Sequence, residues 1–105
     1  MRAKFINEQK QVPEQVINLM LDISSKIKKY LNLKLEPIQD IKYNELTTSY
    51  EGIIPNVDDL TTGQLNYLID LIYDEYPEYK DNIMISYSKD IRGIIVNINT
   101  EFIYE

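Results

Sequence analysis

Residues 82–105 read NIMISYSKDIRGIIVNINTEFIYE, and apolar side chains recur at alternate positions through most of this stretch. Alternation predicts β-strands with one face toward a core, because successive side chains of a strand point to opposite faces of the sheet. Residues 88–93, SKDIRG, interrupt the pattern with a turn that contains glycine. The stretch therefore predicts a β-hairpin with a long final strand. The inward side chains of that strand are expected to be Ile94, Val96, Ile98, Phe102 and Tyr104.

Two segments upstream of the hairpin have the 3.6-residue period of amphipathic helices. The first helix is predicted over residues 14–31. The second helix begins after Thr61, which matches a capping box with Gln64. It ends near Tyr76, because Pro77 disfavours helical geometry in the residue before it. Its inward face is predicted to consist of Leu65, Leu68, Ile69, Ile72, Tyr73 and Tyr76.

The segment between the helices, residues 33–57, has a mixed pattern of apolar and polar residues. It is long for a loop that has neither secondary structure nor function. It predicts a short strand near residues 38–43, and the pattern leaves open whether residues 33–57 form a functional loop or a strand. Residues 2–7, RAKFIN, predict another strand. Helices with one apolar side and a sheet with one apolar face pack as two layers. We therefore expect one α+β domain over residues 1–105, with two amphipathic helices packed on a small antiparallel sheet in the order β-α-(β)-α-β-β.

The composition removes several classes of chemistry. Histidine and cysteine are absent, which excludes thiolate chemistry and removes the commonest general base and metal ligand. The three glycines are too far apart for a phosphate-binding loop. These absences predict a protein that is not an enzyme and holds no cofactor or metal. No apolar run approaches the roughly 18 residues that span a bilayer, and the N-terminus lacks a signal-peptide pattern, so we expect a cytoplasmic protein with no membrane contact.

The net charge of −6 is unevenly distributed along the chain. Residues 1–42 contain eight basic and five acidic side chains, whereas residues 43–105 contain three basic and twelve acidic ones. The second part also holds eight of the nine tyrosines. Because the chain lacks the broad basic footprint of nucleic-acid-binding proteins, direct nucleic-acid binding is disfavoured. The expected partner is a host protein with a basic surface.

The outward face of the second helix is the candidate partner-binding surface. Aromatic and apolar side chains supply contact area there, and carboxylates attract the Arg and Lys side chains of a partner. The candidate residues on this face are Tyr67, Asp70, Leu71 and Asp74, and the surface is continued by Glu75, Glu78 and Tyr79. A solvated polar face accounts for the acids equally well. The coding bias of an AT-rich genome also accounts for part of the tyrosine content, since Ile, Lys, Asn and Tyr supply 44 of the 105 residues.

The final strand is a second candidate surface. Ile95 and Ile103 face away from the predicted core, and an unpaired edge of this strand would recruit another chain. On this alternative, the protein is a self-assembling or virion-associated structural protein that forms a homo-oligomer through its C-terminal edge strand. The competing arrangement is a sheet whose second side is covered by residues 33–57.

The opening residues 1–8, MRAKFINE, are similar in composition to the starts of small phage proteins from AT-rich genomes. In size and acidity the chain also resembles phage inhibitors of host defence nucleases, anti-CRISPR proteins among them. Some of those inhibitors occupy nucleic-acid channels by presenting carboxylates where phosphates would lie. The resemblance implies a non-enzymatic inhibitor that docks on a basic site of a host protein in the host cytoplasm, and it assigns no functional residue.

Overall fold

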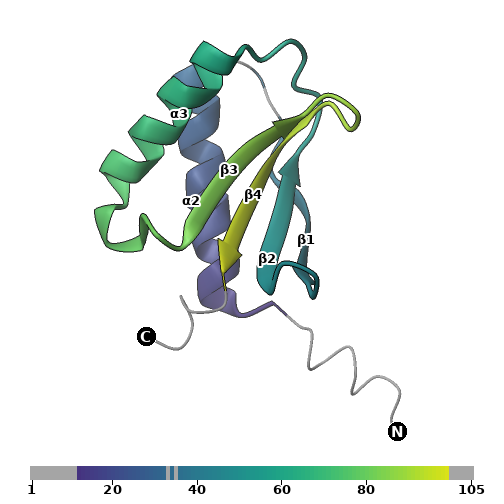
Figure 1. Cartoon of the computed structure of the whole chain (residues 1–105), viewed down its shortest axis with the longest axis vertical. Coiled ribbons are helices and arrows are strands. Elements are labelled where there is room, and N and C mark those ends of the chain that lie inside the picture. The colour runs from purple at the N-terminus through teal and green to yellow at the C-terminus, as the bar shows by residue number, and fades with distance from the viewer. Residues whose placement is uncertain (1–11, 33, 35, 100–105) are drawn as a thin grey trace, which may run out of the picture.

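A four-stranded antiparallel sheet lies against two helices in the computed structural model (Figure 1). The structure describes residues 12–32, 34 and 36–99. The predicted α+β class and both predicted helices are confirmed. The elements in chain order are α2 (Glu14–Leu31), β1 (Gln39–Asn44), β2 (Ser49–Ile54), α3 (Thr62–Glu75), the short 3-10 helix η1 (Pro77–Tyr79), β3 (Ile83–Ser88) and β4 (Gly93–Asn99).

The order of the elements differs from the prediction in the middle of the chain. Residues 33–57 supply two strands, β1 and β2, where the sequence pattern predicts one. These strands form a hairpin within the sheet, so the segment does not cover the second face of the sheet. The strand predicted over residues 2–7 and the predicted inward residues Phe102 and Tyr104 lie outside the described residues.

The sheet order is β1-β2-β4-β3, so two hairpins meet through the pairing of β2 with β4. The register of this pair places Ile54 opposite Ile94 and Gly52 opposite Val96. Because residues that face each other across a ladder share one side of the sheet, Ile54, Ile94 and Val96 all point toward the helices. Among the described strands, β1 and β3 form the two edges.

The core lies between the helices and one face of the sheet (Figure 1). Burying each large aliphatic side chain contributes about 1.5–3 kcal/mol, so this cluster is the main source of stability. The helical and strand periods of the sequence predict its members in α2, α3 and β4, whereas Ile54 comes from β2, which the sequence pattern does not predict. The described side chains with no exposed surface are Val16, Met20, Ile23, Ile27, Ile54, Leu68, Ile72, Ile94, Val96 and Ile98.

The start of α3 is fixed by side-chain hydrogen bonds. The predicted capping box is present: the Gln64 N–H donates to Thr61 Oγ1 over 3.1 Å, and the Thr61 N–H donates to Gln64 Oε1 over 2.9 Å. Just upstream, Arg92 donates to both carboxylate oxygens of Asp58 over 2.7 and 3.1 Å. These hydrogen bonds hold the pKa of Asp58 below its usual range. Together they tie the loop before α3 to the β3–β4 hairpin.

Ser24 of α2 is a buried polar side chain, 2% exposed, whose Oγ accepts the backbone N–H of Ile38 over 3.2 Å. Alanine at this position leaves that N–H without its acceptor inside the protein. We expect Ser24→Ala to lower the free energy of unfolding by about 1–2 kcal/mol, measured by urea denaturation. The exposed neighbour supplies the control, because Ser25→Ala should change stability by no more than about 0.5 kcal/mol. Equal effects of the two variants would contradict the role given to Ser24.

Candidate functional site

Three side-chain contacts join α2 to the C-terminal end of α3 and its C-cap residue Tyr76. The Tyr30 hydroxyl donates to Glu75 Oε1 over 3.0 Å, and Lys26 Nζ lies 3.8 Å from Glu75 Oε2. The Tyr76 hydroxyl donates to the carboxylate of Asp22. Because the contacts span the two helices, they hold the outward face of α3 on a rigid support.

The tyrosine hydroxyls in these contacts stay protonated near neutral pH. Desolvation, together with the hydrogen bond to Asp22, raises the pKa of Tyr76 well above its usual range. Desolvation and the Glu75 carboxylate raise the pKa of Tyr30 as well. Burial and a nearby negative charge both disfavour the tyrosinate form. Both hydroxyls therefore remain hydrogen-bond donors near neutral pH.

The acidic helix face is the outward side of α3, formed by Tyr67, Asp70, Leu71 and Asp74. Spacings of three, four and seven residues place these side chains on one side of the helix. Tyr67 is 61% exposed, both aspartates are exposed, and Leu71 is partly exposed. Among the described residues, neither aspartate has an ion pair or a hydrogen bond from a side chain. The structure thus brings four of the predicted residues together as one exposed surface.

The three further residues predicted for this surface are placed differently. Glu75 is already engaged by Tyr30 and Lys26. Tyr79 is partly buried and packs against the hydrophobic core, because η1 turns its ring inward. Glu78 is exposed in η1, beyond the end of α3. Glu78 therefore extends the acidic helix face by one carboxylate, which has no partner in the described part of the chain.

The C-terminal strand is not an edge strand in its described part. Residues 93–99, β4, pair with β2 on one side and with β3 on the other. The prediction of an unpaired edge is wrong here because β2, which comes from the middle segment, occupies the place beside β4. Ile95 does face away from the core, as predicted. Ile103 lies outside the described residues.

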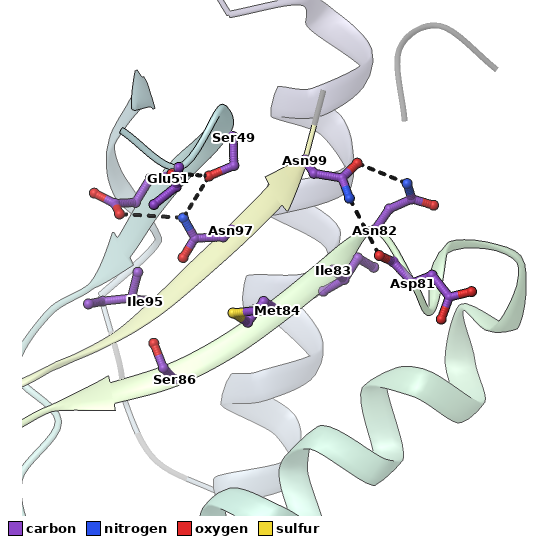
Figure 2. Close-up of a pocket in the computed structure, with 11 residues that line it drawn as sticks. Ser49, Glu51, Asp81, Asn82, Ile83, Met84, Ser86, Ile95, Asn97 and Asn99 are labelled. Carbon is purple, nitrogen blue, oxygen red and sulfur yellow. Dashed lines mark hydrogen bonds between the residues drawn. The ribbon is translucent and has the colours of Figure 1, made fainter. Parts of the chain in front are cut away.

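A pocket of about 390 Å³ lies on the face of the sheet opposite the helices (Figure 2). Within it, Asn97 Nδ2 donates to Ser49 Oγ over 3.0 Å and to Glu51 Oε2 over 3.4 Å. On the other side of the pocket, Asn82 Nδ2 donates to Asn99 Oδ1 over 2.9 Å. We call this feature the polar sheet pocket and define it by Ser49, Glu51, Met84, Ile95, Asn97 and Asn99.

Sequence reasoning places Asn97 and Asn99 on the polar side of the last strand but does not find the pocket. Ser49 and Glu51 belong to β2, and they reach Asn97 only through the β2–β4 pairing, which sets Glu51 opposite Asn97. A local signal does exist in the sequence. Asparagine is a poor strand former, so its repetition in an otherwise apolar strand marks positions that serve something besides packing.

Within the described part of the chain, no three His, Cys, Asp or Glu side chains are grouped as a metal ion requires. None of the described helices is both long enough and apolar enough to cross a membrane. Comparison with protein-family models, with curated proteins and with solved structures finds no match for this chain.

Proposed function

We propose that this chain is a non-enzymatic binding protein that docks its acidic helix face on a basic, nucleic-acid-binding site of another protein. The carboxylates of Asp70 and Asp74 take the place of phosphates and meet Arg and Lys side chains of the partner. Tyr67 and Leu71 supply the apolar area that becomes buried. By occupying the site, the chain acts as an inhibitor in the host cytoplasm, like the phage inhibitors that it resembles.

The observation that supports this proposal most directly is the uncompensated charge at the end of α3. Asp70 and Asp74 are one helical turn apart, and like charges at this spacing destabilise a helix by about 0.2–0.5 kcal/mol. Asp74 also lies in the last turn, which contains no basic residue, although the negative end of the helix dipole favours cations there. These acids therefore do not serve the stability of the helix. A basic partner would remove the repulsion and cover the exposed Tyr67 ring.

Charge reversal tests the proposal. We expect the double variant Asp70→Lys/Asp74→Lys to bind the partner at least about tenfold more weakly, because like charges then face each other across the interface. Immobilised wild-type and variant chains are used to capture proteins from an extract of the native host, and mass spectrometry compares what each retains. A retained nucleic-acid-binding protein is then purified and titrated with both chains.

Two controls isolate the acidic helix face. Asp90→Lys reverses one charge in the exposed turn between β3 and β4, and it should leave binding unchanged. Double-stranded DNA should displace the wild-type chain, because both ligands would occupy one basic site. Thermal unfolding shows whether each variant is folded. Equal affinity of the folded double variant and the wild-type chain would falsify the proposal.

A further inference from the structure

Most hydrogen-bond donors beside Asn97 in the polar sheet pocket bond to neighbouring side chains of the protein. Asn97 uses both hydrogens of its amide, one toward Ser49 and one toward Glu51. The hydroxyls of Ser49 and Thr47 lie 2.6 Å apart and hydrogen bond to each other. Asn44 Nδ2 also donates to Glu51 Oε2, over 3.4 Å. The amide and hydroxyl groups on this side of the pocket therefore leave few donors for a ligand.

The groups left over around Asn97 and Glu51 are acceptors. A carboxylate accepts hydrogen bonds only, so the amide nitrogen of Asn97 must face Glu51 and its carbonyl oxygen must face elsewhere. Figure 2 shows that oxygen on the pocket side, between Glu51 and Met84. Within the described part of the chain, Asn97 Oδ1 and Glu51 Oε1 have no hydrogen-bond partner. The side chain of Asp81 points away in the same view, so Glu51 supplies the negative charge of the pocket.

An apolar strip adjoins these acceptors. Met84, which is 65% exposed, stands opposite Asn97 on β3, and Ile95 lies two residues before Asn97 on the same face of β4. Both side chains border the pocket in Figure 2. An aliphatic stem would cover Met84 and Ile95 while a donor-rich cationic head reached Glu51 and Asn97. A guanidinium fits such a set of acceptors best, since it is planar, always charged and has donors only.

We propose that the polar sheet pocket binds an alkyl guanidinium group. The pocket lies on the sheet layer, whereas the acidic helix face lies on the helical layer. This site is therefore independent of the function proposed above. One cation of the chain itself competes for Glu51: Lys42 lies opposite it on β1. Lys42 forms no ion pair with Glu51 in the described structure, which leaves the carboxylate available.

Titration of the ¹⁵N-labelled full chain with n-butylguanidinium, followed by NMR, tests this site. Saturable shifts are expected at Glu51, Met84, Ile95 and Asn97. The neutral isostere n-butylurea should produce no saturable shift, because it lacks the charge. Free guanidinium at equal millimolar concentration should bind more weakly, because it lacks the stem. The peptide acetyl-Gly-Arg-Gly-amide identifies the natural source of the guanidinium group. Tighter binding of this peptide than of n-butylguanidinium indicates an arginine of a protein chain. Weaker binding indicates a free small molecule.

Variants of the pocket complete the test. Glu51→Gln should weaken the binding of n-butylguanidinium about tenfold, because an amide keeps the size of the carboxylate and loses its charge. Met84→Gln should lower the affinity for n-butylguanidinium severalfold, and its exposed position leaves folding intact. Lys42→Gln should raise this affinity. Asp90→Asn removes a distant charge and should change nothing. Equal shifts with n-butylurea, shifts centred on Asp70 and Asp74, or unchanged affinity in Glu51→Gln would each overturn the proposal.

Discussion

Ile72→Ala is expected to lower the free energy of unfolding by about 3–4 kcal/mol. Ile72 lies on the inner side of α3, has no exposed surface and belongs to the core cluster. Truncation leaves a cavity that α3 cannot close by moving inward, because Tyr30 and Tyr76 tie this helix to α2. Small domains are stable by only about 5–15 kcal/mol, so the loss is a large fraction of the total. Urea denaturation followed by circular dichroism measures it.

Leu71→Ala is the matched control for this variant, because it truncates a side chain of the same size at the adjacent position. Leu71 is partly exposed on the acidic helix face and lies outside the core cluster, so we expect a stability change below about 1 kcal/mol. Partner binding should respond in the opposite way, with Leu71→Ala weakening it and Ile72→Ala acting only through unfolding. Equal losses of stability in the two variants would show that the two sides of α3 are wrongly assigned.

The two sides of α3 are a feature that the sequence predicts well, and the reason is that they depend on local spacing. Leu68 and Ile72 recur at the helical period and are buried, whereas Tyr67 and Asp70 lie on the other side of the helix and are exposed. The bounds of the first helix, residues 14–31, follow from the same pattern. The β3–β4 hairpin is predicted for an equivalent reason, since alternation and a turn are properties of neighbouring residues.

Strand β2 is missed because its identity depends on distant parts of the chain. On its core side, Gly52 stands between Tyr50 and Ile54, so the apolar alternation is interrupted at the centre of the strand. The missing side chain is replaced by others: a Cβ at Gly52 would lie 2.7 Å from Ile38 Cδ1 and 3.1 Å from Met20 Sδ. The pattern of β2 alone does not reveal that a neighbour from another element fills this space.

The two candidate surfaces differ in the same way, because one depends on local spacing and the other on the pairing of distant strands. The acidic helix face is a set of residues on one helix, and helical spacing predicts which of them share a side. The contacts of Glu75 and Tyr79 depend on α2 and on the core, so helical spacing alone does not predict their placement correctly. The polar sheet pocket joins Glu51 to Asn97, 46 residues apart. Such a site becomes visible only when the pairing of β2 with β4 is known.

Gly93→Ala is expected to lower the free energy of unfolding by roughly 2–3 kcal/mol. Gly93 begins β4, and a Cβ there would lie 2.9 Å from the backbone oxygen of Ile54 and 3.0 Å from Ile53 Cγ2. The backbone oxygen cannot rotate away as the end of a side chain can. Ile54 is also fixed, since it is fully buried and paired with Ile94. The methyl group must therefore push β2 and β4 apart at the junction of the two hairpins.

Gly63→Ala is the control, because it adds the same methyl group where space is free. Gly63 lies in the first turn of α3, and the nearest atom to a Cβ there is Thr61 Oγ1 at 4.0 Å. Alanine favours the helix over glycine, so this variant should raise the free energy of unfolding by about 0.5–1 kcal/mol. Urea denaturation of the two variants should therefore give changes of opposite sign. A stabilising or neutral Gly93→Ala would contradict the described register of β2 and β4, which brings the backbone oxygen of Ile54 close to Gly93.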